Sequence, residues 1–287
     1  MNATHKQSQR ALRSTRRAGL TLIELVVVMT ILIALAGLLI PMLPGMLTRA
    51  HTSTCSTNIG EVAKSIQEYN MLYGAYPNNM DALSDGKTLI NYLANGAALP
   101  ASQGGPGTNQ GAGQVTGISP TAAELAALQA AGISTVQSMV AAYPGAGTTF
   151  DPTFNYYSDY ANAGTATANA LTISTSTVLG GLDPTANTNA LAIVNHLGLS
   201  ATGRYVVLGI GTRCNMVGKT MLAAPVHYGD VPVLNPEYGY ERLCGIFKVS
   251  DTAATVVEAQ LVGVGPIHDD GLGSIGDEVQ NWYQISN

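Results

Sequence analysis

The sequence predicts an α+β protein in which a long amino-terminal helix packs on a small antiparallel β-sheet, with a large loop-rich insertion between them. Three observations lead to this prediction. An apolar run that starts behind two arginines lies within residues 16 to 41, an amphipathic helical pattern follows it up to residue 73, and three strand-like segments lie near the carboxyl terminus. Because an amphipathic helix needs a partner to cover its apolar face, the helix and the strands are expected to share one core.

The composition limits the classes of function. Only 11% of the 287 residues are charged, against about 25% in a typical soluble domain. Residues 1 to 19 contain five basic residues and no acid, so eight of the 13 basic residues and all 18 acidic residues lie beyond them. Such an acidic remainder has no broad basic surface for phosphates, so no nucleic-acid binding is expected. Calcium or a basic partner suits it better.

The apolar run is predicted to span a membrane. Residues 25 to 43 include no charged residue, and at about 1.5 Å per helical residue they approach the ~30 Å of a bilayer core. Basic residues precede the run, and few Lys or Arg residues follow it. This asymmetry predicts a single-pass protein with a cytoplasmic amino terminus, in which the chain beyond residue 45 lies on the outer side of the membrane.

The six residues "GLTLIE", 19 to 24, resemble the cleavage and methylation motif of type IV prepilins. The resemblance implies that a prepilin peptidase cuts after Gly19 and methylates the new amino group of Leu20, where the family prefers Phe. Residues 1 to 19 are then a leader peptide. Residues 20 to 45 are then a transmembrane helix that becomes the core of a filament.

One acid, Glu24, lies inside the apolar run. A lone carboxylate in hydrocarbon costs about 2.5 kcal/mol or more, so it usually has a charged or polar partner. Cleavage after Gly19 creates such a partner, because the new α-amino group keeps its positive charge after methylation. We therefore expect Glu24 to pair with this group in its own or a neighbouring subunit during assembly. The alternative is an uncleaved signal-anchor whose Glu24 reaches the membrane interface.

Near the end of the apolar run, the helix is expected to bend or locally melt at Pro41, Pro44 and Gly45, and then to resume as an amphipathic helix over residues 46 to 74. One long helix is predicted from about residue 20 to residue 73, with a break near Pro41 and an end at Gly74 and Pro77. Its apolar residues recur at three- and four-residue steps. They are Ile59, Val62, Ala63, Ile66, Tyr69 and Tyr73.

Residues 55 to 83 are similar to the stretch that follows the spanning helix in pseudopilins. There an apolar-periodic helix ends in a Tyr, a Gly and a Tyr-Pro pair, here Tyr69, Gly74, Tyr76 and Pro77. The resemblance covers about the first third of the chain. It implies a pilin-like fold in a single-pass protein of the bacterial inner membrane, with residues 46 to 287 as a periplasmic globular domain.

The middle of the chain, residues 96 to 202, reads as an insertion rich in Ala, Thr, Asn and Gly. Within it, Thr121 and Glu124 fit a capping box, and Gly132 is a suitable end for the short helix that this box begins. Residues 172 to 178 are predicted to form a strand. The rest of the insertion is expected to be loops.

The carboxy-terminal part, residues 203 to 287, is predicted to contain the sheet. Residues 204 to 210, 243 to 250 and 255 to 264 have strand patterns, and a short turn at Asp251 makes the last two an antiparallel hairpin. Of the three cysteines, Cys55, Cys214 and Cys244, the last two flank strands. We expect them to form the disulfide, which an exported location permits.

An acidic, Gly-rich loop lies close to the end of the chain. Its carboxylates are hard oxygen ligands, as calcium requires, although the EF-hand spacing is absent. The loop is loosely similar to the calcium-binding loop of the major pseudopilins, which an Asn-Trp pair follows, as Asn281 and Trp282 do here. The alternative is a solvated acidic turn. The expected metal ligands are Asp269, Asp270, Asp277 and Glu278.

Three motif matches fail, so no catalytic residue is expected. "CNMVGKT" has Arg213 where a phosphate-binding loop needs Gly, "GLGSIG" has Leu272 where a nucleophile elbow needs Gly, and the histidines lack metal-ligand spacing. Residues 227 to 243 combine three tyrosines and one histidine with acids and two prolines. They are predicted with equal weight to be a contact loop or a plug on their own sheet.

These patterns favour a pilin-like structural subunit, not an enzyme, which a prepilin peptidase processes and which assembles into a type II secretion pseudopilus. Its expected partners are like subunits, other pseudopilins, an inner-membrane assembly platform and membrane lipid. One alternative is a subunit of a type IV pilus or DNA-uptake filament. A different class of alternative is a periplasmic enzyme or binding domain tethered by a signal-anchor.

Overall fold

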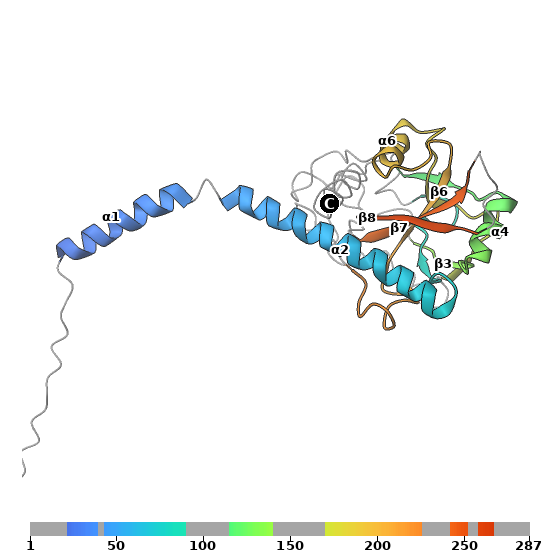
Figure 1. Cartoon of the computed structure of the whole chain (residues 1–287), viewed down its shortest axis with the longest axis horizontal. Helices are drawn as coiled ribbons and strands as arrows, with labels where there is room; N and C mark the ends of the chain where they lie inside the picture. Colours follow the sequence, from blue (N-terminus) through green and yellow to red (C-terminus); the bar gives the residue numbers. More distant parts are fainter. Residues whose placement is uncertain are drawn as a thin grey trace, which may run out of the picture. The chain divides into compact units, whose positions relative to one another are not determined.

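A computed structural model describes residues 22–39, 43–89, 115–139, 170–225, 242–251 and 258–266 of the chain (Figure 1). The chain divides into two compact units, Met1–Ala50 and His51–Asn287. Helix α1 belongs to the first unit, and the β-sheet belongs to the second.

Helix α1, Leu22–Leu39, has only two polar side chains, those of Glu24 and Thr30. The hydroxyl of Thr30 donates a hydrogen bond to the carbonyl of Val26 at 2.8 Å, so the helix itself satisfies that group. The helix ends at Leu39, two residues before Pro41. Proline accounts for this end, because it disfavours helical backbone at the residue before it and has no N–H to donate.

A second helix, α2, covers Leu43–Tyr73. Pro44 and Gly45 lie in its first turn, where the missing N–H of proline costs no internal hydrogen bond. The prediction of one long helix over residues 20 to 73 is therefore wrong. Pro41, where a break was expected, lies between two separate helices, and Pro44 lies inside the second.

Among the described residues, no helix combines the length and the apolar character that crossing a bilayer requires. The expected transmembrane helix is corrected accordingly, and so is the single-pass placement in an inner membrane with a periplasmic domain. The transmembrane helix was predicted on the assumption that residues 25 to 43 form one continuous helix that includes Pro41. Since α1 ends at Leu39, its eighteen residues extend only about 27 Å, and Glu24 occupies its first turn.

The second unit contains one mixed sheet of eight strands. Its strands, in chain order, are β1 Met80–Asp81, β2 Thr116–Ile118, β3 Thr135–Gln137, β4 Ala170–Thr172, β5 Leu179–Leu182, β6 Arg204–Gly209, β7 Leu243–Ser250 and β8 Gln260–Pro266. The main path runs β2-β5-β6-β1-β3-β4, and β7 joins β6 to β8. Strands β1 and β3 are parallel, and every other described pair is antiparallel.

The predicted small antiparallel sheet is therefore wrong in size and in type, although the three predicted carboxy-terminal strands exist. The hairpin of β7 and β8 is confirmed, with Leu243 opposite Pro266. The described part of the expected loop-rich insertion contains more regular structure than was predicted. Residues 96 to 202 contain four of the eight strands, β2 to β5, together with helix α4, Ala122–Ala130, and helix α6, Thr188–His196.

The expected strand over residues 172 to 178 is instead a turn between β4 and β5. Thr177 donates its N–H to the carbonyl of Ser174, and its hydroxyl accepts a hydrogen bond from the N–H of Ser174 at 2.9 Å. Such side-chain bonds compete with a strand ladder, which is why a Ser/Thr-rich segment turns here.

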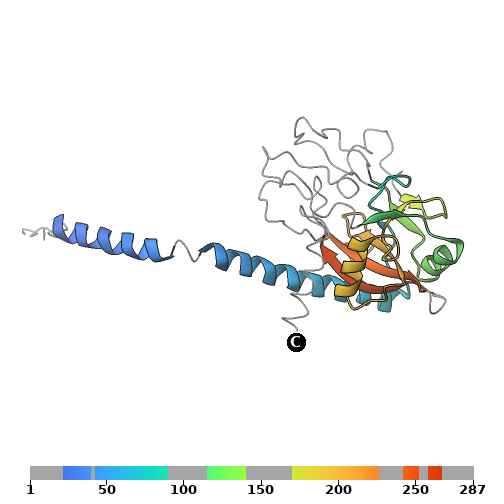
Figure 2. The same ribbon diagram turned by 90° about the horizontal axis from the view of Figure 1, so that it is seen from above.

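Helices cover both faces of the sheet (Figures 1 and 2). On one face, Ile66 of α2 belongs to the same core as Phe247 of β7, whose ring meets that of Tyr76 at 5.2 Å. On the other face, the side chains of Ile246 and of Leu197, just after α6, both lie against Gly263. Adjacent residues of a strand point to opposite faces, so Phe247 lies on the face that α2 covers and Ile246 lies on the face that α6 covers.

The predicted stripe of α2 is confirmed at its centre. Ile59, Val62, Ile66 and Tyr69 are buried, whereas Tyr73 is 53% exposed. Gly74 follows the helix with a φ of 66°, and its N–H donates to the carbonyl of Asn70 at 2.7 Å. This is the left-handed backbone that glycine adopts at a helix end, so Gly74 is the terminator that the sequence predicted.

Candidate assembly surface

Helix α1 exposes apolar side chains along its length and on every side. The described side chains from Leu22 to Gly37 are all exposed, with Leu22 at 81% and Val28 at 50%. Eleven of them are large and hydrophobic. A helix that is apolar all round is normally buried on all sides, so this exposure marks α1 as a surface for association.

Glu24 lies in the first turn of α1. The partial positive charge at a helix amino terminus stabilises a carboxylate at this position. Ile23, Val27 and Val28 surround it on the helix surface. The other residues of the predicted processing site, Gly19 and Leu20, lie outside the described residues.

The expected metal ligands Asp269, Asp270, Asp277 and Glu278 also lie outside the described residues. Within the part of the chain that the structure describes, no three His, Cys, Asp or Glu side chains gather where they could hold a metal ion. Of the proposed contact loop, residues 227 to 243, only Arg242 and Leu243 are described, and both are buried.

The predicted disulfide is wrong, because Cys214 and Cys244 are separate, buried thiols. Burial raises the pKa of Cys214 to about 12, and the charge of Asp81 adds to this effect against a hydrogen bond to the backbone of Met216. Burial also raises the pKa of Cys244 well above its ordinary value, again with a contribution from Asp81. Both cysteines therefore remain protonated and act as small apolar core residues.

The capping box of α4 is confirmed and has a further role. Glu124 accepts a hydrogen bond from the N–H of Thr121 at 2.8 Å, and the N–H of Glu124 donates to the hydroxyl of Thr121 at 3.3 Å. Nη1 of Arg204, at the start of β6, donates to both carboxylate oxygens of Glu124, at 2.8 and 2.7 Å. Buried Glu124, in the first turn of α4, thereby connects this helix to strand β6 of the sheet.

Arg204 also reaches Asp183. Its Nε lies 3.4 Å from Oδ2 of Asp183, an ion-pair contact whose geometry makes no hydrogen bond. Burial alone raises the pKa of Asp183, but hydrogen bonds from Thr185 and Ala186 and the charge of Arg204 outweigh it, so this pKa is lower than usual. The sequence contains no local signal for the cluster, because its three members are separated by at least twenty residues.

A scan of protein-family models, a search of curated proteins and a search of solved structures each find no match to this chain. The narrower expectations of a pseudopilin, of type II secretion and of calcium binding receive no support from these comparisons or from the described residues, and we withdraw them. Among the described residues, the exposed apolar surface of α1 bears most directly on function.

Proposed function

We propose that this chain is a pilin-like structural subunit whose copies assemble through helix α1. The observation that carries the proposal is the exposure of eleven large apolar side chains on that one helix. Covering a Val, Leu, Ile or Met side chain stabilises a protein by about 1.5–3 kcal/mol. Covering most of α1 therefore contributes on the order of 10 kcal/mol, enough to hold subunits together after the entropy cost of association.

Other copies of α1 suit this helix as a covering surface. Its apolar side chains lie on every side, so a partner that contacts a single stripe leaves the remainder in water. A bundle of like helices surrounds each member instead. Val26, Val27 and Val28 are β-branched and stiff, so they lose little side-chain entropy when they become packed.

Glu24 is the residue that restricts how these helices assemble. Placing its carboxylate among apolar helices removes it from water, which is unfavourable unless a cation or a hydrogen-bond donor is close by. We propose that cleavage after Gly19 supplies the cation as the α-amino group of Leu20, four residues before Glu24. A correct register then places a positive group beside each acid, which favours that register over the others.

Substitution within α1 tests the assembly. Val28→Lys places a charge on the apolar surface, so the full-length chain should no longer form large assemblies in sedimentation or in electron micrographs. Gln67→Lys is the matched control, because it adds the same charge at an exposed position of α2 and should leave assembly unchanged. Urea unfolding of the second unit shows whether each variant remains folded. Assembly of Val28→Lys at the wild-type level would refute the proposal.

The processing step has its own test. Mass spectrometry of the mature chain should show an amino terminus at Leu20, and Glu24→Ala should be processed normally yet fail to enter assemblies. A mature chain that still begins at Met1 would remove the proposed amino group from the mechanism. It would leave the association of α1 to be judged by the lysine variant.

A further inference from the structure

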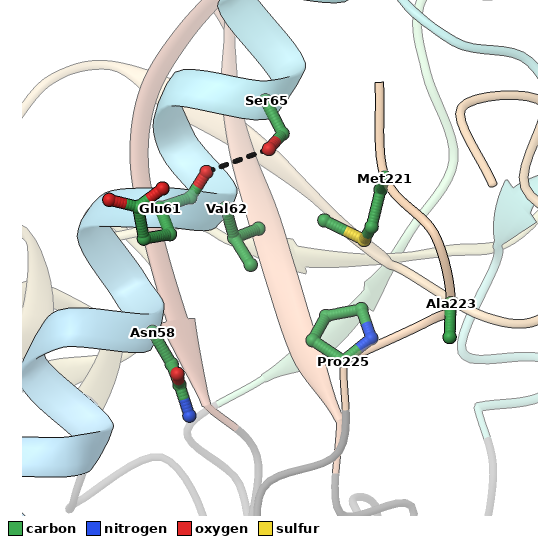
Figure 3. Close-up of a pocket in the computed structure, with 7 residues that line it drawn as sticks. All are labelled: Asn58, Glu61, Val62, Ser65, Met221, Ala223 and Pro225. Atoms are coloured by element: carbon green, nitrogen blue, oxygen red, sulfur yellow. Dashed lines mark hydrogen bonds between the residues drawn. The ribbon is translucent and has the colours of Figure 1, made fainter. Parts of the chain in front are cut away.

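The second unit carries another candidate contact surface, where the segment after β6 faces helix α2 across a cavity (Figure 3). Hydrogen bonds between residues close in sequence hold this loop in a tight turn. The N–H of Lys219 donates to the carbonyl of Met216 at 3.1 Å, and the N–H of Gly218 donates to the carbonyl of Met221 at 2.7 Å. Beyond it, Met221 and Ala223 line a cavity against α2, whereas Leu222 between them is 96% exposed. One short segment thus presents an apolar projection beside an open cavity.

The cavity has a volume of about 320 Å³. Met221, Ala223 and Pro225 form one wall, and the opposite wall consists of residues from α2 (Figure 3). The side of α2 combines buried Val62 with the more polar Asn58, Glu61 and Ser65. An apolar base with a polar rim is suited to a branched aliphatic side chain.

We propose that two copies of this chain meet through this surface about a twofold axis, with Leu222 of each copy in the cavity of the other. A twofold contact uses the same surface on both partners, so projection and cavity must lie on one patch. Met221 and Ala223 line the cavity next to the projecting Leu222, so the arrangement meets this condition. A head-to-tail contact instead requires two separate patches.

The charges of the patch match the same arrangement. Glu61 lies at the cavity, while Nζ of Lys219 lies 4.6 Å from the ring centre of Tyr73 and 3.4 Å from the hydroxyl of Tyr69. Tyr69 follows Glu61 by eight residues, so the two charges are separated by about 12 Å along α2. When two α2 helices lie antiparallel across a twofold axis, Lys219 of each copy comes opposite Glu61 of the other.

Both charges are available for this pairing. Lys64 pairs with Glu68 at 3.9 Å, whereas Glu61 and Lys219 form no ion pair with any described residue. Opposite charges across an interface mainly speed association and select the partner. The apolar contact of Leu222 then contributes most of the binding free energy. This surface belongs entirely to the second unit, so the inference goes beyond assembly through α1 and does not depend on it.

Disulfide formation between two differently tagged full-length chains tests the contact. Both chains carry Cys55→Ser, so that Cys55 cannot form a competing disulfide. One chain also carries Leu222→Cys, and the other carries Ser65→Cys at the cavity, because cysteine is close in size to serine. Mild oxidation should join them about tenfold more than it joins Leu222→Cys with Asn195→Cys, an exposed position on α6 at the other face of the sheet. Association through α1 raises both yields equally. Equal yields from the two pairs would overturn the proposal.

Charge reversal provides the second measurement on the same pair of chains. Glu61→Lys and Lys219→Glu should each lower the disulfide yield several-fold, because like charges then face each other in both halves of the contact. The double variant with both reversals restores opposite charges and should restore the yield. A substitution that merely distorts the loop gives no such recovery, so failure of the double variant to recover would also overturn the proposal.

Discussion

Arg204 is the residue on which the attachment of α4 to the sheet depends most. It provides two hydrogen bonds to Glu124, whose side chain is only 4% exposed, and an ion-pair contact to Asp183. Removing one partner of a buried ion pair is costly, because the other charge remains in a poorly solvated position. The capping bond from Thr121 alone does not replace the lost charge.

We expect Arg204→Ala to lower the free energy of unfolding by about 2–3 kcal/mol, somewhat less than for a fully buried pair because Arg204 is partly exposed. Urea unfolding of the full-length chain measures this. Lys64→Ala is the control, because its pair with Glu68 is exposed and contributes at most about 0.5 kcal/mol. Equal changes in the free energy of unfolding for the two substitutions would show that the Arg204 cluster stabilises the fold no more than an exposed ion pair.

Asp183 makes the stability of this cluster depend on pH. Its pKa in the folded chain is below the ordinary value of 3.8, so the unfolded state binds more protons around that pH. The stabilising contribution is therefore present above about pH 4 and is lost as the pH falls through the folded pKa. Wild type should exceed Asp183→Asn in urea midpoint at pH 6, and the difference should shrink toward pH 3. A difference that does not change with pH would contradict this assignment.

Among the elements, those whose signals are local were predictable. The capping box of α4 depends on two residues three positions apart, and the terminator of α2 depends on one glycine after a periodic stripe. Strands β6, β7 and β8 have six to eight residues each, enough to show strand composition. In each case the residues that determine the element lie within it or next to it.

The strands that were missed are short and pair over long distances. Strand β1 has two residues and β2 to β5 have three or four, rich in Gly, Ala and Thr, so alternation cannot emerge. Their ladders join segments far apart in the chain, such as Met80 with Val136 and Gly180 with Val207. Such pairing is decided by tertiary packing, which no local pattern records.

The helices show a different error. The positions of Pro41 and Pro44 predicted an interruption, which the structure contains, but the apolar stretch was counted across it as one helix. The candidate sites divide in the same way. The apolar surface of α1 and Glu24 are visible in eighteen consecutive residues, whereas the cavity beside Leu222 exists only because residues 221 to 225 fold back on α2.

At the scale of the whole molecule, the two units differ in how their apolar residues are covered. The second unit has a core of its own, in which the stripe of α2 and the sheet cover each other. In the first unit, the described side chains of α1 remain exposed. A chain that has one complete core and also an exposed apolar helix is expected to associate with other chains through that helix.

Proximity of α1 helices in assembled chains tests this central claim most directly. Donor and acceptor dyes are placed on Ala34→Cys, an exposed position of α1, in separate chains that also carry Cys55→Ser. Cys214 and Cys244 are buried, and the pKa of Cys214 is about 12, so neither should react with the dyes. We predict strong energy transfer on mixing, which unlabelled chain dilutes and Val28→Lys abolishes. Assemblies that form without any transfer between these positions would contradict the account.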